Sequence, residues 1–241
     1  MNTENMLFKA QKHLMRAYTA LLINMDIAFE APLPEGPKIL VANHPTTTDP
    51  FFLSLLSDEP VFIPVTGMAF EVPIFGDLLR SAGHIPVDAI TGNGSFVIEQ
   101  SVKKLAAGKT IGIFPEGALS QKIGAFCRTK TGAARMALLS GAPVIPVGIH
   151  LDEDAFIEIT GSTKNYSETG RIVYRGNYAM TIGKGRQYVG GIDDHGFVRH
   201  VAEEIMGLIS QQAKRSEQRI RLNQTQQILP NYGLPYRSFG F

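Results

Sequence analysis

The chain has 241 residues, of which 44% are hydrophobic, and a formal net charge of +1 at pH 7. This length and composition can supply the core of one α/β domain and do not compel a division into two. The near-neutral charge gives no global argument for a nucleic acid partner, so any basic attraction must be local. The single cysteine, Cys127, excludes an internal disulfide and is most simply a small, partly buried apolar side chain.

The N-terminal segment, residues 1–30, has the pattern of a short basic amphipathic helix. Apolar residues recur there at helical spacing, and basic residues gather on another face. The apolar set is Leu7, Leu14, Tyr18, Leu21 and Met25, and the basic set is Lys9, Lys12 and Arg16. Such a helix either packs on the core or docks on a membrane surface.

We expect peripheral association with the cytoplasmic face of a membrane. No stretch of the sequence reaches the roughly eighteen consecutive apolar residues of a membrane span. The uncharged stretch from Ala17 to Met25 is not followed by a small-residue cleavage site, so we expect no signal peptide.

Strand-like and helix-like runs alternate along the rest of the chain. Strands are expected at 39–42, 61–65, 110–114, 144–149, 155–160, 172–174 and 179–182. Helices are expected at about 51–57, 73–81, 95–107, 130–140 and 197–222. This alternation predicts an α/β domain over residues 31–222, with a mostly parallel sheet flanked by helices, and a tail over residues 223–241.

The stretch Asn43-His44-Pro45-Thr46-Thr47-Thr48-Asp49 follows the first of these strands. On an ideal helix five positions turn through about 500°, so His44 and Asp49 would not share a face. Pro45 and Pro50 also disfavour a continuous helix, which predicts a loop. In a loop, His44 can take a proton from a nucleophile while Asp49 holds the ring and stabilises the imidazolium. The alternative is that Asp49-Pro50 opens a helix and that His44 is a core histidine.

Further motifs follow in order. Phe114-Pro115-Glu116-Gly117 ends one predicted strand, and Val144-Ile145-Pro146-Val147 forms another. With Asn43, His44 and Asp49, they resemble the blocks of the glycerolipid acyltransferase family, the lysophosphatidic-acid-acyltransferase-like enzymes. The segment Lys130-Thr131-Gly132-Ala133-Ala134 looks like another of its segments, and Gly83-His84-Ile85-Pro86-Val87-Asp88 is a weaker match. The resemblance covers about residues 38–150.

The resemblance implies an enzyme that moves a fatty acyl group from an acyl thioester, either acyl-CoA or acyl carrier protein, to a lipid acceptor. His44 is then the general base, Asp49 orients it, and the thiolate leaves without a covalent acyl-enzyme. The implied substrate-binding residues are Asn43, Phe114, Pro115, Glu116, Gly117, Lys130 and Pro146. No metal and no cofactor beyond the acyl donor are expected.

Some of these residues have a specific expected part. The Glu116 carboxylate can bind an acceptor hydroxyl, and Gly117 lets backbone amides approach a ligand. Asn43 and nearby amides are candidates for organising the loop or stabilising the oxyanion. Pro146 is a proline within a predicted strand, which indicates a sheet edge or a bulge, and the resemblance places it beside the acyl pocket.

The sequence departs from the family where a phosphate would bind. The family usually carries an arginine after the second block's aspartate and another after Phe-Pro-Glu-Gly-Thr, but here Ala89 follows Asp88, and Ala118-Leu119-Ser120 follow Gly117. Missing fork-like donors weaken phosphate binding, although Lys122, Arg128 or Lys130 can substitute.

We therefore expect a less anionic hydroxyl or amine acceptor, with conventional acylation of 1-acylglycerol 3-phosphate as the alternative. A thioester hydrolase that uses the same base and a non-catalytic lipid-binding module are alternatives from other classes. The sequence has no Gly-x-Ser-x-Gly motif, which a hydrolase with a nucleophile elbow would need.

Overall fold

The computed structural model describes residues 3–88, 92–163 and 166–228. The helices are α1 Thr3–Leu22, α2 Asp49–Leu53, α3 Gly67–Glu71, α4 Phe75–Ser81, α5 Gly94–Ala106, α6 Gly132–Ser140 and α7 His195–Ile228, with a short 3-10 helix at Ser54–Leu56. The strands are β1 Asn24–Phe29, β2 Lys38–Ala42, β3 Val61–Phe62, β4 Pro64–Thr66, β5 Ile85–Val87, β6 Thr110–Ile113, β7 Val144–Leu151, β8 Phe156–Thr163, β9 Tyr166–Val173 and β10 Asn177–Ile182.

Six strands form the main sheet in the order β1, β10, β7, β2, β6, β3. β2 pairs in parallel with both β6 and β7, β3 is parallel to β6, and β1 is parallel to β10. β10 and β7 pair antiparallel. The predicted α/β fold with a mostly parallel, helix-flanked sheet is confirmed. Because β7, β2, β6 and β3 share one direction, their carboxyl ends meet at a common edge of the sheet.

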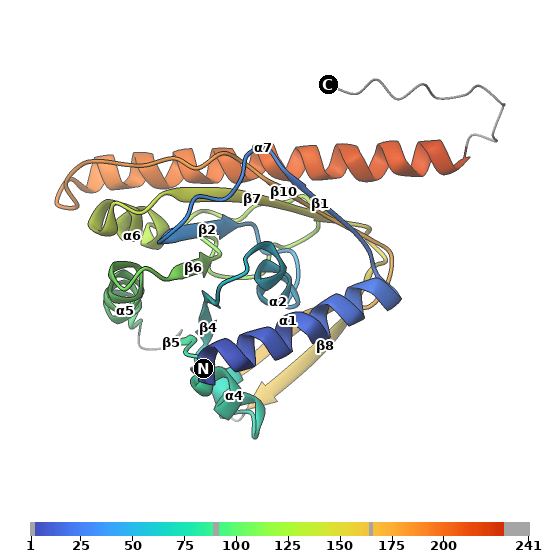
Figure 1. Cartoon of the computed structure of the whole chain (residues 1–241), viewed down its shortest axis with the longest axis horizontal. Coiled ribbons are helices and arrows are strands. Elements are labelled where there is room, and N and C mark those ends of the chain that lie inside the picture. Colours follow the sequence, from blue (N-terminus) through green and yellow to red (C-terminus); the bar gives the residue numbers. More distant parts are fainter. Residues whose placement is uncertain (1–2, 89–91, 164–165, 229–241) are drawn as a thin grey trace.

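Helices cover both faces of this sheet (Figure 1). Ile39 and Val41 of β2 belong to a core formed with α5, α6 and α7, whereas Leu40 and Ala42 belong to a core that includes Phe52 of α2. Every residue of β2 is therefore buried. A strand covered on both faces reads as a continuous apolar run, and this is why Ile39-Leu40-Val41-Ala42 was recognisable in the sequence.

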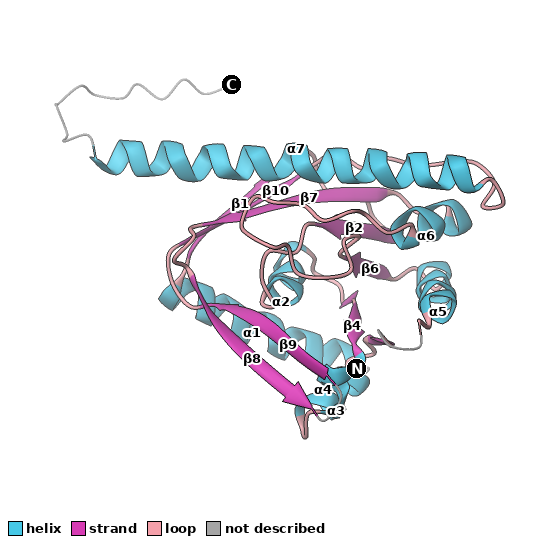
Figure 2. Cartoon of the chain, turned by 180° about the vertical axis from the view of Figure 1, so that it is seen from behind, coloured by secondary structure: helices cyan, strands magenta, loops and turns pink. Residues whose placement is uncertain are grey.

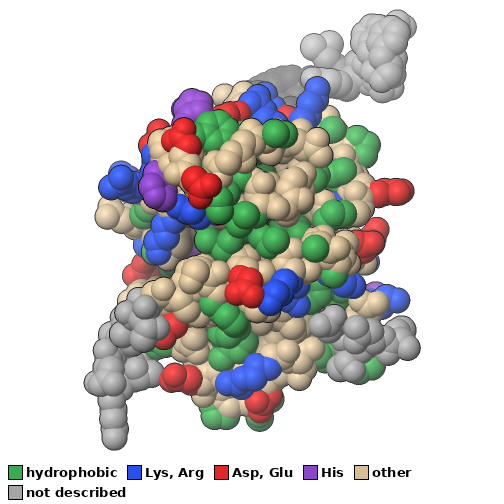
Figure 3. All heavy atoms as spheres, turned by 90° about the vertical axis from the view of Figure 1, so that its left-hand side faces the viewer, with side chains coloured by type: hydrophobic (Ala, Val, Ile, Leu, Met, Phe, Trp, Pro, Cys, Tyr) green, Lys and Arg blue, Asp and Glu red, His purple; other side chains and the backbone are tan. Residues whose placement is uncertain are grey.

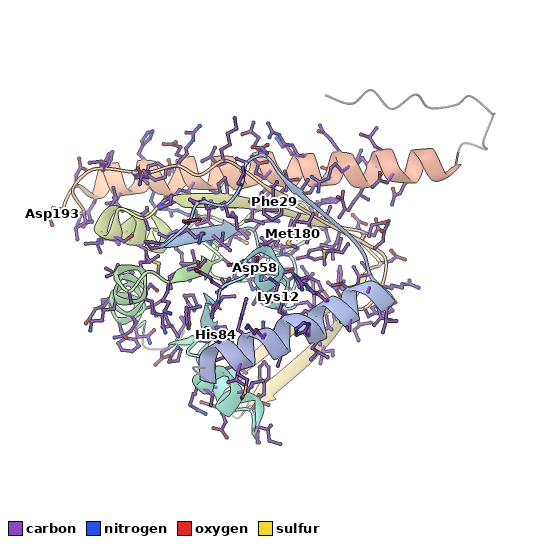
Figure 4. All side chains as sticks on the ribbon, viewed as in Figure 1. Lys12, Phe29, Asp58, His84, Met180 and Asp193 are labelled. Atoms are coloured by element: carbon purple, nitrogen blue, oxygen red, sulfur yellow. The ribbon has the colours of Figure 1, made fainter. Side chains whose placement is uncertain are left out.

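The N-terminal segment differs from its expected structure. α1 ends at Leu22, and residues 24–29 form β1, which pairs with β10 at the edge of the main sheet. Met25 therefore lies in a strand and not in the predicted helix. Lys12, expected on an exposed basic face, is only 7% exposed. Its ammonium donates to the Asp58 carboxylate over 2.7 Å and to the Ser57 carbonyl, so it attaches α1 to the segment that follows the 3-10 helix (Figure 4).

The strand predicted over 61–65 is divided at Ile63. The Ile63 N–H donates to Nδ1 of His84 over 3.2 Å, and its carbonyl accepts from the N–H of Ile85. The chain thereby leaves the main sheet after β3, and β4 pairs with β5 in a separate two-stranded sheet. β8 and β9 form a further antiparallel hairpin, seen from behind in Figure 2.

Pro146 lies in an inner strand, so the expected sheet edge is wrong. β7 runs between β10 and β2. The other expected feature, a bulge, is present: Val147 is opposite Ile182, whereas Val144 is opposite Arg186, so three steps on β7 face four on the other segment. The proline, which has no N–H to donate, thus lies where the ladder is interrupted.

A shallow apolar groove lies between α5 and α6, away from the carboxyl edge of the sheet. It is lined by Ser95, Ile98, Glu99, Val102, Lys103, Arg135, Leu139 and Ile192. Figure 3 views this side of the molecule and shows hydrophobic side chains gathered in its middle. None of the predicted site residues lines this groove. Among the helices of the described ranges, none is both long and apolar enough to cross a membrane.

Candidate functional site

The loop that follows β2 is fixed to β7 by Asn43. The Asn43 side-chain amide donates to the Ile149 carbonyl over 2.9 Å, and its oxygen accepts from the Ile149 N–H over 2.7 Å. This reciprocal pair continues the β2–β7 ladder by one step beyond the strand. Of the two parts expected for Asn43, the geometry supports organisation of the loop rather than stabilisation of an oxyanion.

His44 and Asp49 are brought into contact as their spacing predicted. Nδ1 of His44 lies 3.0 Å from Oδ2 of Asp49. The Asp49 side chain is fully buried, and the His44 side chain is 17% exposed. Nε2 of His44 has no hydrogen-bond partner among the described residues. The imidazole is thus held at one nitrogen by a buried carboxylate, and its other nitrogen is available for a proton.

Asp49 is also held by two residues that sequence reasoning missed. Its Oδ1 accepts from the Tyr178 hydroxyl over 2.7 Å and from the Thr46 hydroxyl over 2.5 Å, and its Oδ2 accepts from the Thr46 N–H over 2.8 Å. Burial, the Asp49 charge and this hydrogen bond raise the pKa of Tyr178 well above its usual value, so the phenol remains a donor. The residue before α2 is Thr48, so the N-cap expected of Asp49 is not what places this carboxylate.

Glu116 joins the His44 loop to the loop after β6. Its carboxylate is 3% exposed and accepts from the N–H of His44 over 3.1 Å and from the N–H of Cys127 over 2.6 Å. The Ser120 hydroxyl donates to the same carboxylate, and the Ser120 N–H donates to the His44 carbonyl over 2.8 Å. This geometry assigns Glu116 to holding the two loops together, rather than to the acceptor hydroxyl that the sequence suggested.

The remaining residues of this block surround the imidazole. The Phe114 ring stacks on His44 with 4.0 Å between ring centroids and 16° between planes. Gly117 has a φ of +67°, which favours glycine. A Cβ there would lie 2.6 Å from Nζ of Lys130. The backbone N–H of Lys130 donates to the Pro115 carbonyl over 2.7 Å. An exposed ammonium therefore lies directly over Gly117, beside the loop that carries Glu116.

Arg171 of β9 attaches the β8–β9 hairpin to both loops. Its guanidinium donates to the carbonyls of Ser120 over 2.7 Å, Gln121 over 2.8 Å and Pro45 over 3.4 Å. The Thr47 N–H also donates to the Arg171 carbonyl over 2.9 Å. No motif in the sequence indicated a role for this residue, which lies far along the chain from both loops. Within the described ranges, no cluster of three or more His, Cys, Asp or Glu side chains is arranged to hold a metal ion.

Two of three related sequences, and one related solved structure, carry the name acyltransferase. The chain is 28% identical over 133 residues to the 1-acyl-sn-glycerol-3-phosphate acyltransferase LPAT1, chloroplastic, of Arabidopsis thaliana, covering 54% of this chain and 36% of that protein. It is 28% identical over 141 residues to the N-acylphosphatidylethanolamine synthase of Arabidopsis thaliana, covering 55% and 49%. It is 28% identical over 122 residues to a 1-acyl-sn-glycerol-3-phosphate acyltransferase of Borreliella burgdorferi, covering 50% and 48%. The chain thus spans about a third to a half of these relatives.

The fold is similar to a solved structure of the same kind. The crystal structure of the 1-acyl-sn-glycerophosphate acyltransferase PlsC from Thermotoga maritima matches with a TM-score of 0.62 and 19% identity, covering 86% of this chain and 78% of that one. The profile of the acyltransferase family matches residues 24–150, which is more than half of the sequence and includes the loops of His44 and Glu116. The chain therefore belongs to the acyltransferase family.

Proposed function

We propose that this protein transfers a fatty acyl group from an acyl thioester to a hydroxyl or amine of a lipid acceptor, with His44 as the general base. The observation that carries the proposal is the His44–Asp49 contact at the carboxyl edge of the sheet. Nδ1 is held at 3.0 Å by a carboxylate that is fully buried, which leaves Nε2 to accept a proton. Open α/β sheets place ligands at this edge.

The proposed reaction needs no covalent acyl-enzyme. Nε2 of His44 takes the proton of the acceptor hydroxyl or amine as its oxygen or nitrogen forms a bond to the thioester carbonyl carbon. The tetrahedral intermediate collapses, the C–S bond breaks, and the thiolate of CoA or acyl carrier protein leaves and takes up a proton. Asp49 stabilises the imidazolium that forms in between. Phe114, stacked on the ring, and Glu116, bonded to the His44 N–H, keep the imidazole in place.

The proposed acceptor is less anionic than lysophosphatidic acid. No arginine follows Asp88 or Gly117 in the sequence, and the Arg171 guanidinium already donates to three carbonyls. Ala89 lies outside the described residues. The relatives do not decide the acceptor, because an N-acylphosphatidylethanolamine synthase and two 1-acylglycerol-3-phosphate acyltransferases match at the same 28% identity.

Conventional acylation of 1-acylglycerol 3-phosphate is the second candidate, and Lys130 is the observation that favours it. Its exposed ammonium lies over Gly117 and can meet an anionic group of either substrate. Lys130→Met should weaken use of a phosphate-bearing acceptor if this candidate is correct. Lys122→Met, which removes an exposed cation from the same loop, is the matched control.

The test is incubation of the full chain with acyl-CoA species or acyl carrier protein and a panel of lysolipids. Mass spectrometry of the lipids and release of free thiol are measured together. We expect thiol release to equal acylated lipid, with an uncharged or zwitterionic acceptor used fastest. Faster acylation of lysophosphatidic acid than of every other acceptor would establish the second candidate. Thiol without lipid product would indicate a hydrolase, and bound lipid without thiol would indicate a binding module.

The proposal includes peripheral association with a membrane through α1, because a lipid acceptor must be reached in a bilayer. Leu14 and Leu21 are 64% and 81% exposed, and Lys9 and Arg16 are also exposed. Lys12, which the sequence placed in the same basic set, is buried and donates to Ser57 and Asp58 instead. An outward apolar stripe beside cations is typical of helices that lie in the membrane interface.

A further inference from the structure

Exposed hydrophobic side chains are concentrated at one end of this molecule. Of the fifteen large hydrophobic side chains exposed among the described residues, ten lie on α1, on the α3–α4 segment or on the β8–β9 hairpin. These ten are Met6, Leu14, Leu21, Leu22, Val72, Ile74, Leu78, Ile157, Ile159 and Ile172, and the other five are Phe29, Phe96, Leu139, Val189 and Leu222. Figure 1 shows α1, α4 and β8 at the end opposite α7. Exposed apolar side chains gathered at one end of a molecule are typical of an interaction site.

The most exposed of the ten belongs to a strained turn. Ile74 lies between α3 and α4, is 85% exposed and has φ of 68° and ψ of −50°. The Phe75 N–H donates to the Pro73 carbonyl over 2.7 Å, which closes a γ-turn of the rare form around Ile74. Among the described residues other than glycine, Ile74 is the one with positive φ. A β-branched residue is strained in this conformation, which lowers the stability of the folded protein. The strained turn presents an apolar side chain to the surroundings.

Cations accompany this surface on α1, which packs against α4. Lys9 and Arg16 are exposed along α1 beside the outward stripe that contains Leu14 and Leu21. The same helix buries Phe8 and directs its other side into the core. α1 therefore combines outward apolar groups with positive charge, which complements the headgroups of a bilayer that contains anionic lipid, whereas the turn at Ile74 is flanked by the exposed carboxylates of Glu71 and Asp77.

We propose that the turn of residues 72–75 is a membrane-insertion site, in which Ile74 enters the acyl region of a bilayer while α1 lies in the headgroup layer. This inference rests on the proposed function, because a bilayer is where a lipid acceptor resides. The protein would then contact the membrane at two places, α1 and the turn at Ile74. Two contacts restrict the orientation of the sheet edge relative to the membrane. A bilayer covers the exposed isoleucine and accounts for the strain that presents it.

The test compares Ile74→Asn with Val189→Asn. Asparagine is polar and not β-branched, so Ile74→Asn removes the apolar group and lessens the crowding at positive φ. Val189, in the segment before α7, is 92% exposed and provides a matched β-branched control away from α1, α4 and β8. Flotation of the full chain with phosphatidylethanolamine–phosphatidylglycerol vesicles, without acyl donor, measures binding. We expect binding to fall about tenfold or more for Ile74→Asn and to be unchanged for Val189→Asn. The melting temperature of Ile74→Asn should equal or exceed that of the wild type.

Several outcomes would overturn the inference. Flotation of Ile74→Asn equal to that of the wild type removes the insertion site, and an equal loss for Val189→Asn shows that any exposed apolar group acts alike. If Ile74→Asn melts at a lower temperature, Ile74→Gly, which also suits the positive φ, gives the deciding measurement. A wild-type dimer that Ile74→Asn converts to a monomer, seen by light scattering, shows a protein interface instead.

The same variants separate this inference from the proposed function. Turnover of a lysolipid dispersed in detergent micelles should be equal for Ile74→Asn and the wild type, since Ile74 contacts none of the site residues described above. A wild-type protein that floats with vesicles but transfers no acyl group to any acceptor ends the proposed function and leaves the insertion site standing. A wild-type protein that transfers acyl groups but does not float with vesicles overturns the insertion site and leaves the proposed acyl transfer standing.

Discussion

The sheet edge that carries His44 and the end that carries Ile74 differ in which side chains are buried and which are exposed. At the sheet edge, Asp49 and Glu116 are buried, and each has several hydrogen-bond donors within 3.3 Å. At the other end, Ile74 and Leu21 are more than 80% exposed. A buried charge is costly unless hydrogen bonds pair it, and a gathering of exposed apolar side chains is typical of an interaction surface. The sheet edge is therefore suited to a catalytic site, and the end that carries Ile74 is suited to contact with another surface.

The largest effect should follow from breaking the His44–Asp49 pair. We expect His44→Ala and Asp49→Asn each to reduce turnover by about a hundredfold or more, because the base or its charged partner is lost. Asp49→Asn is the sharper variant, since Thr48 precedes α2 and the helix start does not depend on the Asp49 side chain. Acyl transfer assays and circular dichroism are the measurements.

Asp77→Asn is the control for this pair of variants, because Asp77 is an exposed carboxylate of α4 that pairs with Arg80. It should leave turnover unchanged. A correctly folded Asp49→Asn protein with near-normal turnover would contradict the general-base mechanism.

The next prediction concerns the connection between the Ile74 end and the core. Burial and the Lys104 charge lower the pKa of His84 to about 4 from 6.5, and its Nδ1 accepts from the Ile63 N–H. Below pH 6.5 the unfolded chain therefore takes up a proton that the folded chain does not. The free energy of unfolding should fall as the pH drops from 6.5 to 4, by about 3 kcal/mol, and should not depend on this group above pH 6.5.

Urea unfolding of the wild type and of His84→Asn across this pH range checks the effect. The asparagine carbonyl can still accept from Ile63, so the variant should show a flatter dependence on pH. Some slope should remain, because burial also lowers the pKa of His150. Equal slopes for the two proteins would show that His84 does not titrate on unfolding.

A smaller effect at the sheet edge should follow from Tyr178→Phe. This change removes the donor that faces Oδ1 of Asp49 at 2.7 Å and leaves the carboxylate less firmly placed. We expect kcat to fall about tenfold while KM changes little, as for an interaction that acts through the base. Tyr18→Phe is the matched control, because the Tyr18 hydroxyl donates to the Val173 carbonyl rather than to Asp49. An equal loss of kcat in both variants would mean that general packing, and not the Asp49 contact, is responsible.

The sequence predicted the local part of the site because that part depends on short spacings. His44 and Asp49 are five positions apart in a proline-bounded loop, and β2 was recognisable from its continuous apolar run. The predicted contact is present at 3.0 Å. The same reasoning assigned Glu116 to a substrate, because a sequence cannot show that the N–H groups of His44 and Cys127 converge on one carboxylate.

The parts that were missed depend on contacts between distant segments. Tyr178 reaches Asp49 only because β10 pairs with β7, and Arg171 reaches both loops only because the hairpin folds beside them. Neither residue lies in a motif. β1 was missed because residues 24–29 directly follow α1 and are stabilised by pairing with β10. The register between distant strands is set by the whole fold, so no local sequence pattern predicts it.

The smallest predicted effect concerns α1 and separates docking from folding. Removing residues 1–25 would delete Phe8, Lys12 and the start of β1, all of which the fold uses, so truncation cannot isolate membrane binding. Leu21→Gln changes a side chain that is 81% exposed and should alter stability by less than about 0.5 kcal/mol. Vesicle flotation should weaken by roughly threefold to tenfold, since one apolar contact is lost from an otherwise intact surface.

Leu222→Gln is the matched control for Leu21→Gln, because Leu222 is 62% exposed and belongs to a different helix, α7. Its flotation should equal that of the wild type. Raising the salt concentration should weaken binding of the wild type and of Leu21→Gln by the same factor, since Lys9 and Arg16 remain in both. A loss of salt dependence in Leu21→Gln would show that the apolar stripe and the cations do not act on the same surface, and docking through α1 would then have to be abandoned.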